Sequence, residues 1–545
     1  NIQMTSVVYK EKVYNLPFPL TCQQAVKEIG MEGTPSTVIG LRVNGVVQSL
    51  NSYINSTYCT VAPCYIKCVE GQNMARRSEL LLVRYAVHRV CPDVELTIDN
   101  EYGDSVQYLM SPTISPAQLE QINREFKALH SKTISTEELP HNYLNLHFVE
   151  THQPHSKSLI ESLNNPTYQC AVIDKFASLS LSQPYLSDPS ILHEVSTIEI
   201  VDGTLIVKFP SLIHTDSFTF AEAPKVTLPY HLAREFDVGQ ANKAVATRTY
   251  TELMIESENH HVQQLTRLID LIHSKTTKLV LIAGPSSSGK TTFAHKLALG
   301  LQGAGYTPLV LSVDNYYVHK DYCPLDANGK RDWECIDSLR LGLLNEHLCS
   351  LMEGKEVTIP HFDFATSTPI PNKGTKVRLA QNGIIIMEGI HCLNERLTEK
   401  VPHDNKVKVF IAPISNQVCL TDDVVLSNNF LRIQRRMVRD CIFRSYEPKK
   451  TLDVWDNVAG SEKTWIYPFI KDADFVYSTF LTFETNVLIT FSLNFLRRVS
   501  VDDKNYGFAQ SYLRLLSYYL PMDTLEFANN SIIREFIGNG VFDCH

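Results

Sequence analysis

The sequence predicts an α/β protein whose last part is a mostly parallel, helix-covered sheet, preceded by a β-grasp domain and an α+β domain. Three observations predict this class: short apolar runs alternate with helical stretches from residue 278 onward, one hairpin pattern lies near residue 44, and another lies near residue 202. A chain of 545 residues is too long for a single core. We expect domains at 1–72, 76–235 and 278–545, with a helical connector at 236–277.

The first domain is predicted from a helix followed by a hairpin. Thr21 is a suitable N-cap for a helix that includes Ile29. The hairpin strands, 38–43 and 46–50, are joined by Asn44-Gly45, a pair that supplies the positive φ angles of a type I′ turn. A strand, a helix, a hairpin and a further strand in this order indicate a ubiquitin-like β-grasp.

The second domain combines helix and hairpin patterns. Ser115-Pro116 supplies the N-cap and first residue of a helix, and Asp202-Gly203 is a strong hairpin turn. Two groups in the first two domains raise the alternative of a metal site, although neither matches a metal template. We expect hydrogen-bonded or solvated histidines and buried thiols instead. The residues are His141, His147, His152 and His155, and Cys59, Cys64 and Cys68.

An amphipathic helix at 259–273 is predicted to lead into the last domain, where apolar strands alternate with helices. This alternation is typical of a parallel sheet covered on both faces. The expected strands are 279–283, 309–313, 384–387, 407–411 and 475–477.

The composition excludes some classes of function. A net charge of −9 gives no global basic surface, which makes nucleic-acid binding unlikely as a main role. No apolar run approaches the roughly 20 residues that cross a bilayer. Thirteen scattered cysteines do not resemble a disulfide framework, so we expect a cytoplasmic protein in a reducing compartment.

The strongest functional motif is an octet between an apolar strand and a helix. Residues 284–291 satisfy the GxxxxGK[ST] pattern. Glycines let the backbone fold around an anion, while amide groups and the helix N-terminus direct positive dipoles at phosphates. We expect ATP and Mg²⁺ as cofactors, with Lys290 at the β and γ phosphates and the Thr291 hydroxyl on the metal. The expected nucleotide-binding residues are Gly284, Pro285, Ser286, Ser287, Ser288, Gly289, Lys290, Thr291 and Thr292.

Two acids follow predicted strands of the same sheet, on the side where open parallel sheets bind ligands. Asp314 is a candidate for taking the proton of an acceptor hydroxyl or for holding magnesium, with a loop-capping role as the alternative. Glu388 is the candidate acid on the magnesium side, although apolar strands also end in acids where they surface. With the octet, these acids give the proposed catalytic set Lys290, Asp314 and Glu388.

A predicted helix at 430–441 carries Arg432, Arg435, Arg436 and Arg439, and Arg444 lies just beyond it. Arginines suit a lid that clamps a transferring phosphoryl group. Spacing alone does not separate lid arginines from surface arginines.

In these residues and their order, the chain resembles the phosphoribulokinase/uridine kinase family over roughly residues 278–477. The whole chain looks like a longer subgroup in which a TGS-like β-grasp domain and a module similar to the second additional domain of threonyl-tRNA synthetase precede the kinase. The middle domain lacks the HxxxH and CxxxH pair of the synthetase editing site, so no aminoacyl-tRNA hydrolysis is expected. The matching blocks are Gly284–Thr292, Ser312–Tyr317, Asp332-Trp333-Glu334 ahead of Asp337, Ile359–Phe364, Met387–His391 and Arg435–Asp440.

The resemblance implies a P-loop kinase that transfers phosphate from ATP to a nucleoside, with Asp314 as the base at a ribose hydroxyl. It places Glu334 and Phe362 in the acceptor pocket, and Arg432 and Arg436 are candidate substrate contacts. The chain departs from uridine kinases at Cys335-Ile336, where His-Pro is usual, and at Phe362, where tyrosine is common. These departures change which polar groups of an acceptor are bound.

Two readings of function remain besides an ATP-dependent metabolite kinase. One is a non-catalytic nucleotide-binding or structural component of a larger assembly, docked or self-associated through residues 1–235. The other is an RNA-linked regulator, which the acidic balance disfavours.

Overall fold

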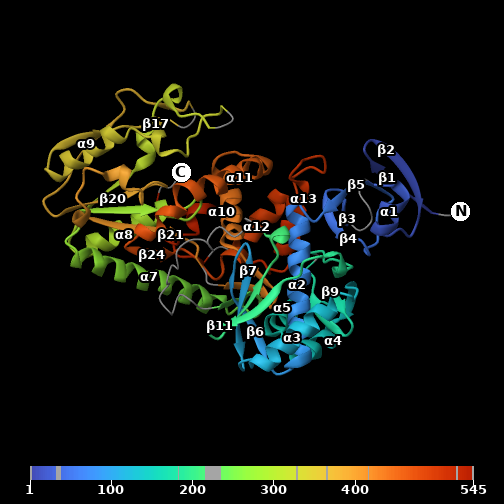
Figure 1. Cartoon of the computed structure of the whole chain (residues 1–545). Coiled ribbons are helices and arrows are strands. Elements are labelled where there is room, and N and C mark those ends of the chain that lie inside the picture. Colours follow the sequence, from blue (N-terminus) through green and yellow to red (C-terminus); the bar gives the residue numbers. More distant parts are fainter. Residues whose placement is uncertain are drawn as a thin grey trace.

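A computed structural model of the chain describes residues 3–31, 38–181, 183–214, 235–326, 329–363, 366–414, 417–522 and 526–542 (Figure 1). Phe364 and residues 215–234, which fall within the predicted family block and second domain, lie outside the described residues. The molecule is elongated, with the first domain at one end and the parallel-sheet domain at the other.

The first domain is the predicted β-grasp, a five-stranded sheet crossed by one helix. The strand order is β2-β1-β5-β3-β4, and only β1 and β5 pair in parallel. Thr21 caps the helix in a capping box, and Asn44 and Gly45 have the positive φ angles, 49° and 79°, that the hairpin requires. The elements are β1 (Met4–Tyr9), β2 (Lys12–Pro17), α1 (Cys22–Ile29), β3 (Val38–Val43), β4 (Val46–Ser49) and β5 (Tyr58–Tyr65).

The second region is the predicted α+β unit, and it has two antiparallel sheets around the long helix α2. Ser115 caps α3 as predicted, and Asp202-Gly203 turns the β11–β12 hairpin. The sheet orders are β11-β12-β7-β6 and β10-β9-β8. The elements are α2 (Val69–Val90), β6 (Glu95–Glu101), β7 (Ser105–Ser111), α3 (Pro116–Leu129), β8 (Ser135–Pro140), α4 (His141–Glu150), α5 (Pro154–Leu163), β9 (Thr167–Ile173), β10 (Phe176–Leu179), β11 (Thr197–Val201) and β12 (Thr204–Lys208).

The last domain is built on a five-stranded, fully parallel sheet with the order β15-β20-β14-β21-β24. Side chains alternate between two cores: Val280 and Ile282 contact the core beside α8, whereas Leu279 and Leu281 contact the core beside α9. The apolar runs therefore predicted all five strands. They are β14 (Leu279–Ala283), β15 (Thr307–Ser312), β20 (Gly383–Glu388), β21 (Lys406–Ala412) and β24 (Phe475–Ser478).

Helices and two short ribbons complete this domain (Figure 1). The ribbons pair β16 (Glu356–Ile359) with β19 (Thr375–Arg378), and β17 (Phe362–Asp363) with β18 (Thr368–Pro369). The helices are α8 (Lys290–Gly303), α9 (Leu341–Met352), α10 (Asn428–Phe443), α11 (Pro448–Trp465), α12 (Glu484–Leu496), α13 (Tyr506–Leu516) and α14 (Arg534–Ile537).

The connector contains more than the predicted helix. Helix α6 (Val238–Ala246) precedes α7 (Tyr250–Ser274), which is longer than the predicted 259–273 and packs on α8. Before them, β13 (Glu235–Asp237) pairs in parallel with β22 (Gln417–Thr421), which forms a hairpin with β23 (Val424–Leu426). The connector is thus joined by strand pairing to an insertion from the last domain.

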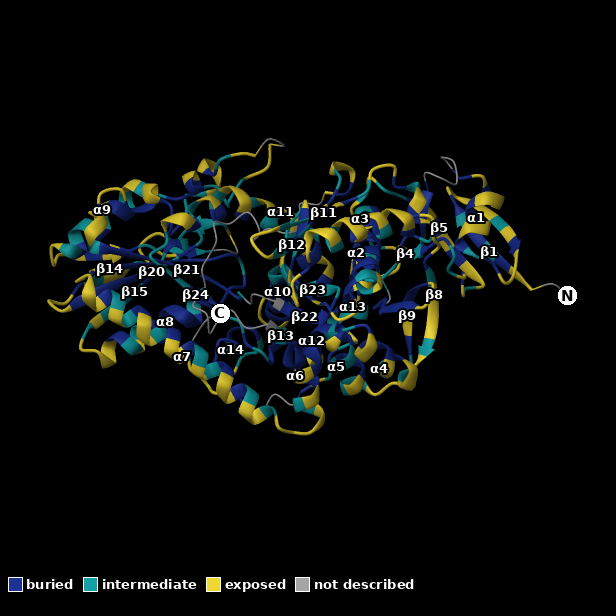
Figure 2. Ribbon diagram, turned by 60° about the horizontal axis from the view of Figure 1, so that its bottom comes forward, coloured by how far each residue is buried: buried dark blue, intermediate teal, exposed yellow. Residues whose placement is uncertain are grey.

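The turn of the β22–β23 hairpin docks into the second region. Arg84 of α2 forms an ion pair with Asp423, with Nε and Oδ1 2.6 Å apart, and both side chains are less than 10% exposed. Asp422 accepts hydrogen bonds from the amides of His155 and Ser156 in the first turn of α5. The junction is therefore a buried polar contact beside an apolar cluster to which β22, α10 and α12 contribute buried side chains, and the dark-blue segments in this part of Figure 2 are these buried residues.

Candidate active site

The phosphate-binding loop runs from the end of β14 into α8, as the octet predicts. Ser287 and Gly289 have φ angles of 60° and 90°. A Cβ at Gly284 would lie 2.1 Å from the carbonyl oxygen of Ile411, so only glycine fits where the loop leaves the sheet. Lys290 folds over the loop, and its Nζ donates to the carbonyl oxygens of Gly284 and Pro285 at 2.9 and 3.1 Å.

Lys290, Asp314 and Glu388 converge at the carboxyl edge of the sheet. Glu388 is the last residue of β20, the strand between β14 and β15, and Asp314 lies in the turn that follows β15. Burial raises the pKa of Glu388 to about 7, and repulsion by Asp314 adds to this while Lys290 opposes it. Burial also raises the pKa of Asp314, again against the attraction of Lys290.

The predicted acceptor residues lie together on the other side of these acids. Tyr317, Trp333 and Phe362 form an aromatic cluster with ring centroids 5.4 to 5.9 Å apart. Glu334 is half-buried beside it; burial raises its pKa to about 6, and the positive charge of Arg436 counteracts the effect. The cluster gives a planar apolar surface with a carboxyl group at its edge.

The arginines of α10 divide into two groups that spacing did not separate. Arg432 and Arg435 are at most 1% exposed and lie under the phosphate-binding loop. Arg432 forms an ion pair with Glu462 and donates through Nε to the Ser286 carbonyl oxygen at 2.9 Å. Arg435 pairs with Glu484 at 2.5 Å. These two side chains hold the loop from beneath rather than face an acceptor.

The second group faces the site. Arg436 donates to the Ser286 hydroxyl at 2.5 Å and lies 3.4 Å from a carboxylate oxygen of Asp440. Arg444 also pairs with Asp440, at 3.5 Å, and its charge acts on Asp314. Arg439 pairs with Asp440 as well. The Asp440 carboxylate therefore forms ion pairs with three guanidinium groups beside the phosphate-binding loop.

Two acids that the sequence did not single out occupy amides of the phosphate-binding region. Glu462 accepts from the Ser286 amide at 3.1 Å, and Glu535 accepts from the Thr292 amide at 3.0 Å. Near Glu535, Ile532 lies 2.8 Å from the position that a Cβ on Gly289 would take. Both acids are more than 150 residues from the amides they contact and belong to no motif, so no local pattern could have identified them.

The set of donors fits a magnesium ion. Thr291 is the second residue of α8, and the Asp314 and Glu388 carboxyls lie close enough to Lys290 for its charge to act on both, which gives the hard oxygen ligands that Mg²⁺ prefers. Among the described residues, no group of three or more His, Cys, Asp or Glu side chains has the geometry of a protein-only metal site. In the second region, His147 bonds to the backbone of Ala177 and His155 lies 3.3 Å from Asp237.

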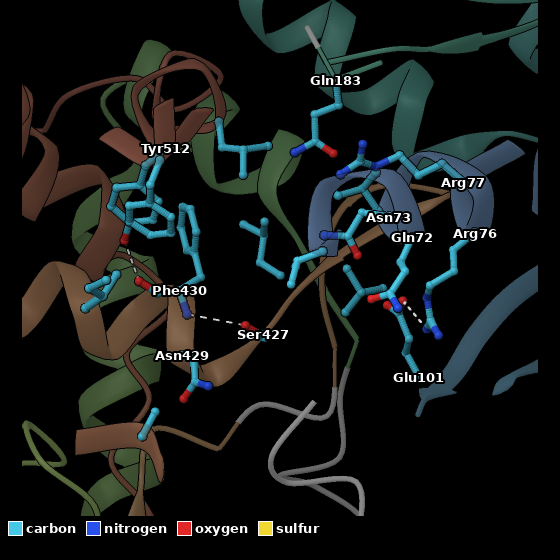
Figure 3. Close-up of a pocket in the computed structure, with 18 of the residues that line it drawn as sticks. Gln72, Asn73, Arg76, Arg77, Glu101, Gln183, Ser427, Asn429, Phe430 and Tyr512 are labelled. Carbon is cyan, nitrogen blue, oxygen red and sulfur yellow. Dashed lines mark hydrogen bonds and ion pairs between the residues drawn. The ribbon is translucent and has the colours of Figure 1, made fainter. Parts of the chain in front are cut away.

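A separate cavity of about 810 Å³ lies between α2 and helices α10, α11 and α13 (Figure 3). Asn73, Arg77 and Gln183 line one side, and Phe430 and Tyr512 line the other. Trp455, also on the wall, stacks on the guanidinium of Arg432 at 5.3 Å. Arg432, which also donates to the Ser286 carbonyl oxygen, thus links the cavity wall to the phosphate-binding loop.

Comparison with known proteins places the similarity in the last domain. A family model described as "Phosphoribulokinase / Uridine kinase family" matches residues 279–486. A uridine kinase of Lactobacillus johnsonii is 32% identical over 169 residues, which is 31% of this chain and 70% of the relative. A uridine kinase of Macrococcus caseolyticus is 28% identical over 205 residues, covering 37% and 88% of the two chains.

A solved structure described as a possible uridine kinase from Bacillus stearothermophilus covers 40% of this chain and 98% of its own. Its sequence identity is 20% and its TM-score is 0.26.

The described helices include none that is long and apolar enough to cross a membrane.

Proposed function

Because the chain belongs to the phosphoribulokinase/uridine kinase family through residues 279–486, we propose that it is an ATP-dependent kinase that phosphorylates a hydroxyl of a small metabolite, with a nucleoside as the first candidate. The observation that carries this proposal is the convergence of Lys290, Asp314 and Glu388 at the carboxyl edge of the parallel sheet. That edge is where open α/β sheets bind ligands.

The phosphate side supports ATP. Residues 284–292 would hold the phosphates through backbone amides, and Lys290 would leave the loop carbonyls to reach the β and γ phosphates. Thr291 and Glu388 would hold Mg²⁺, which neutralises charge on the transferring group when bound. Arg436 and Arg444 add positive charge at the same edge, where negative charge spreads during transfer.

We assign the role of general base to Asp314. A carboxylate there would accept the proton of the acceptor hydroxyl while the hydroxyl oxygen bonds to the γ phosphorus and the bond to ADP breaks. The raised pKa of Asp314 makes it a better proton acceptor than an exposed aspartate. The aromatic cluster of Tyr317, Trp333 and Phe362 would stack on a planar base, and Glu334 would bind a polar edge of it.

The test is ADP release across a panel of nucleosides and sugar phosphates. Lys290→Ala and Asp314→Asn are expected to lower turnover by at least a hundredfold. Asp321→Asn, which changes an exposed aspartate in the following turn, is the matched control and should keep wild-type turnover. Equal turnover in the wild type and Lys290→Ala would reject the kinase assignment.

A specific observation also favours the non-catalytic alternative. Glu462 and Glu535 already occupy two amides that a nucleotide phosphate would need, Ser286 and Thr292. A chain that keeps this arrangement would bind nucleotide weakly and act through its domain contacts. Titration with a fluorescent ATP analogue, together with the acceptor panel, separates the cases: weak binding without turnover on any acceptor supports the alternative, and rapid turnover rejects it.

For the front half we propose the predicted TGS-like domain at 1–72, the synthetase-like domain at 76–235 and the connector at 236–277 as units that dock the kinase in an assembly. The buried Arg84–Asp423 contact supports a fixed junction between them and the last domain. The cytoplasm is the proposed compartment, because the described cysteines are free thiols. Salt-sensitive binding of tRNA would favour the RNA-linked alternative instead.

A further inference from the structure

Two cysteines lie in contact where the β-grasp domain joins the second region. Cys64 is near the end of β5 and is fully buried, and Cys68 is the half-buried N-cap residue of α2. Their sulfur atoms are 3.4 Å apart. Only Tyr65, Ile66 and Lys67 separate them, so the pair spans the junction between the two domains.

The surroundings of Cys68 favour its thiolate. One Nη of Arg42 donates to the Cys68 sulfur at 3.4 Å, and the 22-residue helix α2 begins at the next residue. Glu70 is the opposing charge, but Arg42 binds it through two nitrogens at 3.1 and 3.3 Å and so partly neutralises it. Arg42, Glu70 and Cys64 are the titratable groups that act on this sulfur.

The two thiols differ in acidity for a clear reason. The two sulfurs share a hydrogen bond, which lowers the pKa of Cys68 to about 6 and raises the pKa of Cys64 when Cys64 is the donor. The Cys68 thiol also donates to the Tyr65 carbonyl oxygen at 2.9 Å, and this bond is lost when the thiolate forms. The amide of Gly71 and the charge of Arg42 lower the pKa of Cys68 further. A half-exposed thiolate next to a second thiol is the usual arrangement of a redox-active cysteine pair.

We propose that Cys64 and Cys68 form a redox-active dithiol that closes reversibly to a disulfide, with Cys68 as the attacking sulfur. The oxidant is a hydroperoxide. The Cys68 thiolate attacks one peroxide oxygen, which breaks the O–O bond, gives a sulfenic acid and releases hydroxide. The Cys64 sulfur then attacks the Cys68 sulfur, loses its proton and releases water, leaving the S–S bond. A small thiol reverses the reaction by exchange.

Closing the bond requires a small movement, because the sulfurs must approach from 3.4 Å to about 2.0 Å. The disulfide would remove the negative charge that faces Arg42 and tie the end of β5 to the start of α2. It would thus restrain the short link between the β-grasp domain and the rest of the chain.

The same domain contains a natural comparison pair. Cys22 and Cys59 are both fully buried, and burial raises the pKa of each thiol, to about 12 for Cys22. Neither has an arginine among the groups that act on it. Cys59 is therefore expected to stay reduced where Cys68 reacts.

Peptide mapping tests the proposal on the full chain. Trypsin cuts after Arg42, Lys67 and Arg76, so Cys64 falls in peptide 43–67 and Cys68 in peptide 68–76. After treatment with limiting hydrogen peroxide at pH 7 and blocking of free thiols, we expect the two peptides joined, two hydrogens lighter than their sum, and separated by dithiothreitol. Fragment masses should place the bond at Cys64 and not at Cys59. Recovery of both peptides separately, with alkylated thiols, would overturn the proposal.

Three variants test the separate steps of the proposed oxidation. Cys64→Ser should trap the sulfenic acid, so that dimedone labels Cys68, whereas Cys59→Ser should leave the cross-link unchanged. Arg42→Gln should slow oxidation of Cys68 by about twofold at pH 7, because a rise of about one unit from a pKa of about 6 lowers the ionised fraction from about 90% to about 50%. Dimedone labelling of wild-type Cys68 that persists without a cross-link would show that Cys64 does not resolve it and would overturn the dithiol.

Discussion

The phosphate side and the acceptor side of the candidate active site are built in different ways. Under the phosphate-binding loop, the Arg432–Glu462 and Arg435–Glu484 pairs are at most 3% exposed. In the segment that follows Trp333 and Glu334, Asp337 pairs with Arg396, and each side chain is 52% exposed. The ion pairs on the phosphate side are therefore buried, whereas this pair on the acceptor side is half-exposed.

The difference has a physical consequence. A phosphate chain is the same in every ATP-dependent reaction, so a loop locked by buried pairs can bind it in one geometry. Acceptors vary, and half-exposed side chains can change with little effect on folding. The phosphate side should therefore be sensitive to substitution in stability and nucleotide binding, and the acceptor side mainly in substrate preference.

The largest expected effect is on the buried pair. Arg435→Met leaves Glu484 buried without its partner and should lower the free energy of unfolding by about 3–5 kcal/mol. Arg396→Met is the matched control, because it breaks an exposed pair and should change stability by less than about 1 kcal/mol. Denaturant unfolding measures both. Equal losses of unfolding free energy in the two variants would contradict the proposed difference between the phosphate side and the acceptor side.

Removing the Glu388 carboxyl, whose pKa is raised by burial, should stabilise the ligand-free protein. The pKa of Glu388, about 7 in the fold against a reference value of 4.5, means that ionisation disfavours folding as pH rises from about 4.5 to 7. Glu388→Gln should therefore raise stability by about 2 kcal/mol at pH 8 and little at pH 4.5. Glu399→Gln, at an exposed position, should show no such pH dependence in thermal unfolding. A stabilisation that is the same at both pH values would contradict the assignment.

The next effect concerns the phosphate-binding loop itself. Glu535→Gln removes a negative charge from the Thr292 amide and should tighten binding of an ATP analogue by about five- to tenfold. Glu526→Gln changes an exposed acid of the same C-terminal segment and should leave the affinity unchanged. Fluorescence titration measures both. Weaker binding in Glu535→Gln would show that Glu535 supports the nucleotide site rather than competes with phosphate.

The sequence predicted what depends on local pattern. The octet, the five strands, the Asn44-Gly45 turn and the Ser115 cap are each set by neighbouring residues, and the structure contains all of them. The convergence of Lys290, Asp314 and Glu388 followed from the rule for carboxyl ends of parallel strands.

The features that the sequence did not predict depend on contacts between residues that are far apart along the chain. Arg432 was expected to contact substrate, but it is buried on Glu462, 30 residues along the chain. Glu535 reaches Thr292 across 243 residues, and Asp423 reaches Arg84 across 339. Such pairs have no spacing rule, because tertiary packing alone brings their elements together.

The smallest expected effect is on the acceptor side. Phe362 is 4% exposed, and its ring packs with Tyr317 and Trp333 in the aromatic cluster of the proposed acceptor pocket, so Phe362→Tyr adds a hydroxyl to that cluster. Phe362→Tyr should change stability by about 1 kcal/mol or less while shifting the ratio of kcat/KM between two nucleosides by about threefold to tenfold. Phe469→Tyr, elsewhere in the same domain, is the control and should leave the ratio unchanged. A large loss of stability without a change in the kcat/KM ratio would mean that the acceptor side tolerates substitution no better than the phosphate side. The two sides would then differ only in the burial of their charged pairs.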